Sequence, residues 1–70
     1  MKYVGLTDDT QIRKQQHGNP SDWWQRTFQT EKEARDWEKD MLNRVGYKGG
    51  TGGAGWKYGY TYTITVSTRE

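Results

Sequence analysis

Four residues whose side chains could act on an anionic substrate lie in the first 38 positions of this sequence: Tyr3, Arg13, His17 and Glu38. Arg13 and His17 are four residues apart, so a helix would place them on one side. The forked donors of an arginine suit phosphoryl oxygens, and a histidine can serve as a general base. A glutamate offers the carboxylate oxygen that hard divalent cations prefer. The combination suits chemistry at a phosphate group.

A short strand and a short helix must position the first three of these residues. Residues 3–7 predict a strand with Val4 and Leu6 on one face, and with Tyr3 on the other. A helix start follows at once, because either Asp8 or Asp9 can cap it. The strand therefore leads directly into the helix that carries the arginine and the histidine.

Tyr3-Val4-Gly5, followed by Arg13 and by His17 one turn later, resembles the second half of the GIY-YIG endonuclease signature. In that superfamily a Tyr-Ile-Gly strand leads into a helix with an essential arginine, and a later helix supplies a metal-binding glutamate. Glu38 falls where the family places that glutamate. The resemblance covers roughly the first two thirds of the chain and rests on the order and spacing of short pieces.

The resemblance implies a phosphodiesterase that depends on Mg²⁺ or Mn²⁺ and acts on DNA or RNA. Glu38 would hold the cation and Arg13 would neutralise the phosphoryl oxygens. A tyrosine, either Tyr3 or one from the last strand, would orient or deprotonate water, with His17 assisting as base.

The sequence departs from the family at its beginning. The family's first strand carries Gly-Ile-Tyr and should precede Tyr3, where only two residues stand. We expect the last strand of this chain to lie beside residues 3–7 and to take that position, as in a circular permutation. Tyr58, Tyr60 or Tyr62 would then replace the missing tyrosine; the candidate site includes Tyr60.

Residues 18–22 form a cluster of helix breakers, and residues 23–29 then predict a strand. Trp24, Arg26 and Phe28 share one face of it. The stem of Arg26 is expected to pack between the aromatic rings with its guanidinium reaching outward. A contact between Arg26 and a phosphate is the weaker alternative.

Thr30 to Glu33 form a capping box, which opens a helix predicted to end at Gly46. Its apolar arc contains Ala34, Trp37, Met41, Leu42 and Val45, and Glu38 falls inside the same arc. A carboxylate facing a core is costly unless it is paired. Glu38 is therefore expected either to form an ion pair with Arg13 or Arg26, or to bind a divalent cation.

A glycine-rich linker at residues 48–55 separates this helix from a last strand, predicted over residues 56–67 with Trp56, Tyr58, Tyr60 and Tyr62 on one face. The order strand-helix-strand-helix-strand predicts an α+β fold. We expect a single domain over residues 1–70, with helices packed on a three-stranded, largely antiparallel sheet.

The composition sets wider limits. The chain contains no cysteine, which excludes disulfides and thiolate metal sites, and no apolar run long enough to span a membrane. The cytoplasm is the expected location. Its mean hydropathy of −1.27 is very low, but four Trp and five Tyr can supply an aromatic core. The formal charge of +2 favours anionic partners only mildly.

Two alternatives to an endonuclease remain open. One is a module that binds nucleic acid without cutting it, with aromatic residues of the last strand stacking on bases. The other is a homodimer formed through the last strand. The candidate nucleic-acid contacts are Arg13, Lys14, Arg26, Lys57 and Tyr58.

Overall fold

The structure is a computed structural model, and it describes residues 1–49, 55–66 and 68. Four strands and two helices follow one another as β1 (Lys2–Thr7), α1 (Thr10–Gln16), β2 (Trp24–Thr27), α2 (Glu31–Leu42), β3 (Tyr47–Lys48) and β4 (Tyr58–Thr63). The α+β class is confirmed. No helix of the described residues is long and apolar enough to cross a membrane.

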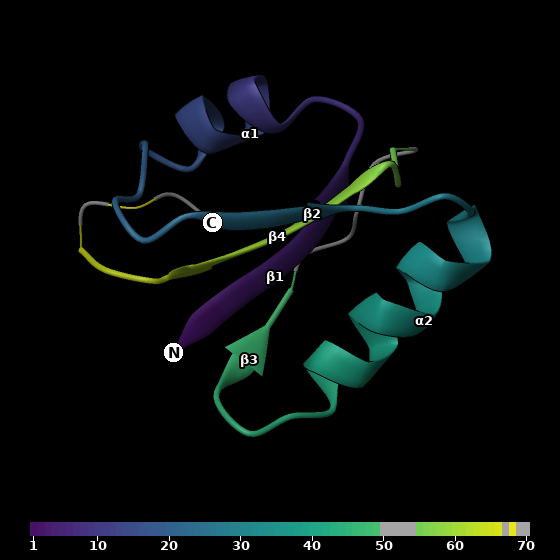
Figure 1. Ribbon diagram of the computed structural model, residues 1–70. Helices are drawn as coiled ribbons and strands as arrows, with labels where there is room; N and C mark the ends of the chain where they lie inside the picture. Colours follow the sequence, from purple (N-terminus) through teal and green to yellow (C-terminus); the bar gives the residue numbers. More distant parts are fainter. Residues whose placement is uncertain (50–54, 67, 69–70) are drawn as a thin grey trace.

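The strands form one mixed sheet in the order β2-β4-β1-β3, so the last strand of the chain lies between the second and the first (Figure 1). β4 pairs with β1 antiparallel along its whole length, from Lys2 opposite Thr63 to Thr7 opposite Tyr58. The predicted pairing of the last strand with the first is therefore confirmed. The other edge of β4 pairs antiparallel with β2.

The prediction of three strands is wrong, because β3 adds a fourth that runs parallel to β1. Only two residues long, β3 is too short to show an alternating pattern. α2 also ends earlier than predicted, at Leu42 with Asn43 as its C-cap. The chain then turns through Gly46, whose φ of 89° favours glycine, and Gly46 accepts a hydrogen bond from the Lys2 amide.

Val45 lies beyond the end of α2 and Leu42 is the last residue of that helix, and both are exposed although they were predicted in the apolar arc. β4 is likewise shorter than the predicted strand over residues 56–67, of which residue 67 lies outside the described part. The greater part of the predicted linker, residues 50–54, lies outside it too.

One face of the sheet packs against α2 (Figure 1). Alternation along paired strands places Val4 and Leu6 of β1 on this face, together with Gly59 and Thr61 of β4. The core here consists of Leu6, Phe28 and Ala34, with Trp37 and Trp56 packed against it. Trp56 was predicted to share a face with Tyr58, Tyr60 and Tyr62. It precedes β4, however, so the alternation of side chains along that strand does not determine its direction.

Trp37 and Met41 of α2 were predicted to be buried, and the structure leaves both half-buried. The ring centroid of Trp37 lies 5.4 Å from that of Phe28 and 6.2 Å from that of Trp24. A sheet this small cannot cover the full width of a helix, so the arc on α2 is only partly shielded.

The opposite face of the sheet carries Tyr3, Tyr60 and Tyr62, and the end of α1 closes over it. β4 is consequently buried on both faces. A strand in the middle of a small sheet with a helix on each side has no exposed face, which explains how a chain of such low hydropathy obtains a core.

Candidate active site

His17 lies between two tyrosine hydroxyls of β4. Its Nε2 is 2.9 Å from the Tyr60 hydroxyl, and its Nδ1 is 2.7 Å from the Tyr62 hydroxyl. All three side chains are buried, with relative exposures of 5% for His17, 2% for Tyr60 and 1% for Tyr62. A chain of three hydrogen-bonded side chains that can all exchange protons thus occupies one face of the sheet.

Local rules of helix capping place His17 there. Asp9 is the N-cap of α1 and accepts a hydrogen bond from the Ile12 amide, as one of the two predicted caps. His17 is the C-cap, and its amide donates to the Arg13 carbonyl. Gly18 follows with a φ of 84°, which turns the chain away and ends the helix. Seven residues of helix are therefore enough to set His17 over β4.

Tyr3 and Trp23 enclose this cluster. The Tyr3 ring centroid is 4.9 Å from that of His17 and 5.3 Å from that of Tyr62. Trp23 stacks on Tyr60 at 4.4 Å with an interplanar angle of 12°. Stacked and tilted rings at these separations attract one another and fix the orientation of the hydroxyls between them.

Burial raises the pKa of Tyr60 well above its ordinary value of 10.0, and the neighbouring Tyr3 raises it further. The positive charge of Arg13 acts in the opposite direction and lowers this pKa, whereas the negative charge of Glu38 raises it. The charges of Arg13 and Glu38 are therefore both felt at the Tyr60 hydroxyl. Of the predicted site residues, Tyr3 and His17 lie next to Tyr60.

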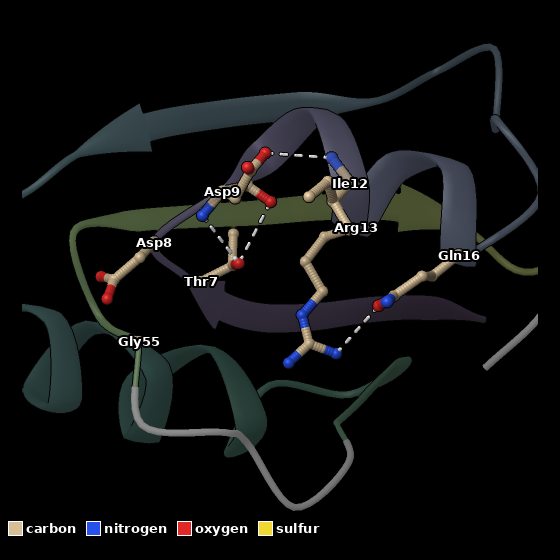
Figure 2. Close-up of a pocket in the computed structure, with 7 residues that line it drawn as sticks. All are labelled: Thr7, Asp8, Asp9, Ile12, Arg13, Gln16 and Gly55. Atoms are coloured by element: carbon tan, nitrogen blue, oxygen red, sulfur yellow. Dashed lines mark hydrogen bonds between the residues drawn. The ribbon is translucent and has the colours of Figure 1, made fainter.

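A pocket of about 330 Å³ opens beside α1, lined by Thr7, Asp8, Asp9, Ile12, Arg13, Gln16 and Gly55. Figure 2 shows the Arg13 side chain leaving α1 and extending into this pocket, with its Nη1 donating to the Gln16 Oε1 at 3.4 Å. Arg13 forms no ion pair within the described part of the chain. Its guanidinium thus retains donors for an anion.

Asp8 lines the same pocket but serves the fold. Its Oδ1 accepts hydrogen bonds from the amides of Trp56 and Lys57, at 3.1 and 3.3 Å. Gly55 passes so close that a Cβ there would lie 2.5 Å from the Asp8 amide nitrogen. These contacts attach the start of β4 to the end of β1.

Glu38 is half-buried, with 16% of its side chain exposed, and its nearest charged partner is Arg35 at 3.9 Å on the same helix. In the described residues Glu38 has no ion pair with Arg13 or Arg26. The predicted ion pair of Glu38 with one of these two arginines is therefore wrong. At that distance the pair with Arg35 is weak, and the carboxylate keeps capacity for another ligand.

The described residues contain no group of three His, Cys, Asp or Glu side chains that could form a metal centre by themselves. Mg²⁺ is commonly held by one or two carboxylates, with waters and substrate phosphates completing its shell. The single carboxylate of Glu38 fits this mode of binding, but it does not provide a site made of protein ligands alone.

The predicted nucleic-acid contacts divide between the two faces of the sheet. Arg26 lies on the α2 side, with its guanidinium carbon 4.7 Å from the centroid of the Phe28 ring. The charged group itself therefore lies over the ring, whereas the sequence predicted that it would reach outward. Lys14 is half-exposed on α1, and Lys57 is exposed just before β4. Tyr58, opposite Thr7, is half-buried. Arg26 is thus separated by the sheet from Arg13.

Sequence reasoning left Tyr62 as one of three alternatives and did not assign Trp23 to the site. The structure gives Tyr60 and Tyr62 equal access to His17. Their spacing of two residues, which places both on one face of a strand, was the pattern that could have indicated a pair. Nothing in the spacing of Trp23 connects it to Tyr60.

Comparison of the chain with models of known protein families, with curated proteins and with solved structures found no match in any of the three.

Proposed function

We propose that this domain binds nucleic acid and hydrolyses phosphodiester bonds with the help of Mg²⁺ or Mn²⁺, as a permuted GIY-YIG-like nuclease. The observation that carries the proposal is the buried cluster of Tyr3, His17 and Tyr60, which brings β1, the end of α1 and β4 together one helical turn from Arg13. β1 contributes Tyr3 and α1 contributes His17, while the charges of Arg13 and of Glu38 act on the pKa of Tyr60 without contacting it in the described residues.

Tyr60 and His17 would supply the base. With its raised pKa, Tyr60 holds its proton at neutral pH and donates it to the Nε2 of His17. As a water attacks phosphorus, the water passes a proton to the Tyr60 oxygen while Tyr60 passes its own to His17. The new P–O bond forms, the bond to the leaving alkoxide breaks, and the imidazolium returns the proton to that alkoxide through Tyr60 or to solvent.

Arg13 would bind the phosphate itself. Its guanidinium reaches into the pocket and forms no ion pair in the described residues, so it can donate two hydrogen bonds to non-bridging oxygens. The charge that develops on these oxygens during attack would strengthen the contact in the transition state.

Glu38 is the residue that would hold the divalent cation, which when bound stabilises negative charge on the phosphate and the leaving oxygen. Lys14 and Lys57 would meet the flanking phosphates, because both stand on segments that border the pocket of Arg13.

Cleavage of a supercoiled plasmid and of labelled single- and double-stranded RNA would test the proposal, each with Mg²⁺, with Mn²⁺ and with a chelator. We expect cleavage that requires the cation and is lost in Arg13→Ala. The matched control is Arg44→Ala, which removes an exposed arginine paired with Asp40 on α2. Cleavage that survives chelation or the Arg13→Ala change would contradict the proposal.

Binding without cleavage is the second candidate, and the deep burial of Tyr60 favours it, since a catalytic hydroxyl must reach its water. Stacking of bases on the last strand is excluded for Tyr60 and Tyr62, because both rings are covered. In this case Arg13→Ala would weaken binding and reduce its salt dependence, while no condition would give cleavage.

A homodimer through the last strand is less compatible with the structure. Both edges of β4 are already paired inside the chain, with β1 and with β2. A second copy could pair with β4 only after β4 had left the sheet.

A further inference from the structure

His17 meets a hydroxyl at each ring nitrogen, and this imposes a choice on its proton. A neutral imidazole carries one N–H donor and one acceptor nitrogen. Tyr60 faces Nε2 and Tyr62 faces Nδ1, each within hydrogen-bond distance. Either Nδ1–H donates to Tyr62 and Nε2 accepts from Tyr60, or the two roles are exchanged. The two tautomers differ in what the cluster can do.

Only the first tautomer can take a proton from Tyr60. Nε2 must present a lone pair to the Tyr60 hydroxyl, so the ring proton must stay on Nδ1. In the second tautomer Nε2–H points at the Tyr60 oxygen, and no site on His17 is open to the Tyr60 proton. The hydrogen bond at the far nitrogen normally selects the tautomer of a histidine.

The group at the far nitrogen is the Tyr62 hydroxyl. Its ring is 1% exposed, so the hydroxyl takes the place that water would have beside Nδ1. Tyr3, Trp23 and Tyr60 provide the other rings that face His17, and the charged residues of its own helix are Arg13 and Lys14, both within about one turn of it. In the described part of the chain, the partner at Nδ1 is a phenol, where many catalytic histidines have a carboxylate.

We propose that Tyr62 is a positioning residue that accepts a hydrogen bond from Nδ1–H of His17 and so keeps Nε2 free to receive the proton of Tyr60. The role rests on the proposed function, because it concerns the same proton transfer. Tyr62 keeps its own proton throughout. When Tyr60 protonates Nε2, the imidazolium retains its Nδ1–H bond to Tyr62, and charge and protons balance within the cluster.

The tautomer can be measured without any activity. His17 is the only histidine in the chain, so the imidazole ¹⁵N signals of the labelled protein belong to it without further assignment. Two-bond ¹H–¹⁵N correlation spectra distinguish Nδ1–H from Nε2–H in the neutral ring. We expect Nδ1–H in the wild-type protein. Nε2–H as the main form would overturn the proposal, whether or not the protein cuts nucleic acid.

Tyr62→Phe then tests the consequence, since it removes the hydroxyl and keeps the ring. We expect the Nδ1–H signal to give way to Nε2–H or to a mixture, and kcat to fall about 10- to 100-fold with KM unchanged. Tyr47→Phe on β3 is the matched control, because it removes a hydroxyl from a half-buried tyrosine outside the cluster. We expect it to change neither quantity.

The outcomes separate the two proposals. A Tyr62→Phe protein that is folded, keeps Nδ1–H and cuts as well as the wild type would overturn the role of Tyr62 alone. A wild-type protein that cuts no nucleic acid would overturn the proposed function, and the ¹⁵N spectra would still decide what Tyr62 does to His17. If Tyr62→Phe does not fold, the wild-type spectra decide the question.

Discussion

The hydroxyl end of Tyr60 lies directly over Gly5 of the neighbouring strand. A Cβ built on Gly5 would come within 2.5 Å of the Tyr60 hydroxyl oxygen and 2.6 Å of the ring carbon that carries it. A real Cβ atom does not come that close to a non-bonded heavy atom, so something would have to shift. Tyr60 can therefore reach His17 only because position 5 has no side chain. This explains why a glycine is needed at the third position of the Tyr-Val-Gly triplet.

Gly5→Ala should displace the Tyr60 hydroxyl from His17. We expect a loss of about 1–3 kcal/mol in the free energy of unfolding, because the core must move to admit the methyl group. Cleavage should fall far more than stability does, below detection while the protein remains folded.

Gly59→Ala is the comparison for that variant. A Cβ on Gly59 would come within 2.5 Å of Trp37 and 2.7 Å of Phe28, on the α2 side of the sheet. Its cost in stability should be similar, but the His17 signals should shift less than in Gly5→Ala. Equal effects of both variants on cleavage and on His17 would mean that Gly5 has no particular connection to the site.

Arg13→Ala should abolish cleavage, by at least about 100-fold, while the thermal unfolding curve hardly moves. Arg13 is half-buried on a short helix that has no buried residue of its own, so little packing is lost. Arg13→Lys keeps the charge and loses the forked donors, and should recover binding better than cleavage. An Arg13→Ala protein that cuts normally would remove this residue from the site.

Glu38→Gln and Glu38→Ala should also abolish cleavage, and higher Mn²⁺ should not restore it. The carboxylate is half-buried with only a distant partner, so its removal should leave the free energy of unfolding unchanged or raise it slightly. Glu33→Gln, an exposed position on the same helix, is the control. Marked destabilisation by Glu38→Ala would instead indicate a structural role.

Tyr60 should make the folded protein less stable in alkali. Its pKa is raised on folding above the ordinary value of 10.0, so above that pH the unfolded chain loses a proton that the native state keeps. The free energy of unfolding should thus be undiminished below pH 10 and fall above it, by at most about 1.4 kcal/mol per pH unit. Urea unfolding across that range, compared with Tyr60→Phe, isolates this contribution. Identical pH dependence in both proteins would show that Tyr60 titrates normally.

Trp37→Ala should destabilise the domain by about 3 kcal/mol, since the ring packs against Leu6, Phe28 and Ala34 but is only half-buried. A domain of this size has little stability in reserve, so much of the population should unfold at moderate temperature. Thermal unfolding followed by circular dichroism measures this. An unchanged midpoint would show that the packing of α2 on the sheet is wrong.

Local patterns in the sequence were sufficient for much of this fold. Alternation identified the strands around Tyr3 and Tyr60, and caps identified both helix starts, because these features depend on residues within a few positions of one another. The pairing of the last strand with the first was expected from the resemblance and not from any local pattern.

Local patterns did not predict where the helices and strands end, and they did not predict the short strand β3. α2 stops at Leu42 because the chain must turn back to reach the edge of β1, where Gly46 accepts the Lys2 amide. That requirement is set by a partner more than forty positions away in sequence.

The candidate site divides in the same way. The sequence was enough to select Tyr3, Arg13, His17 and Glu38, because residue types and their order along the chain can be read directly from it. Only the tertiary structure decided that two tyrosines of β4 share His17, that Arg26 lies across the sheet, and that Tyr60 passes over Gly5. Those relationships depend on strand register, and register is fixed by side-chain packing across the whole sheet rather than by any one segment.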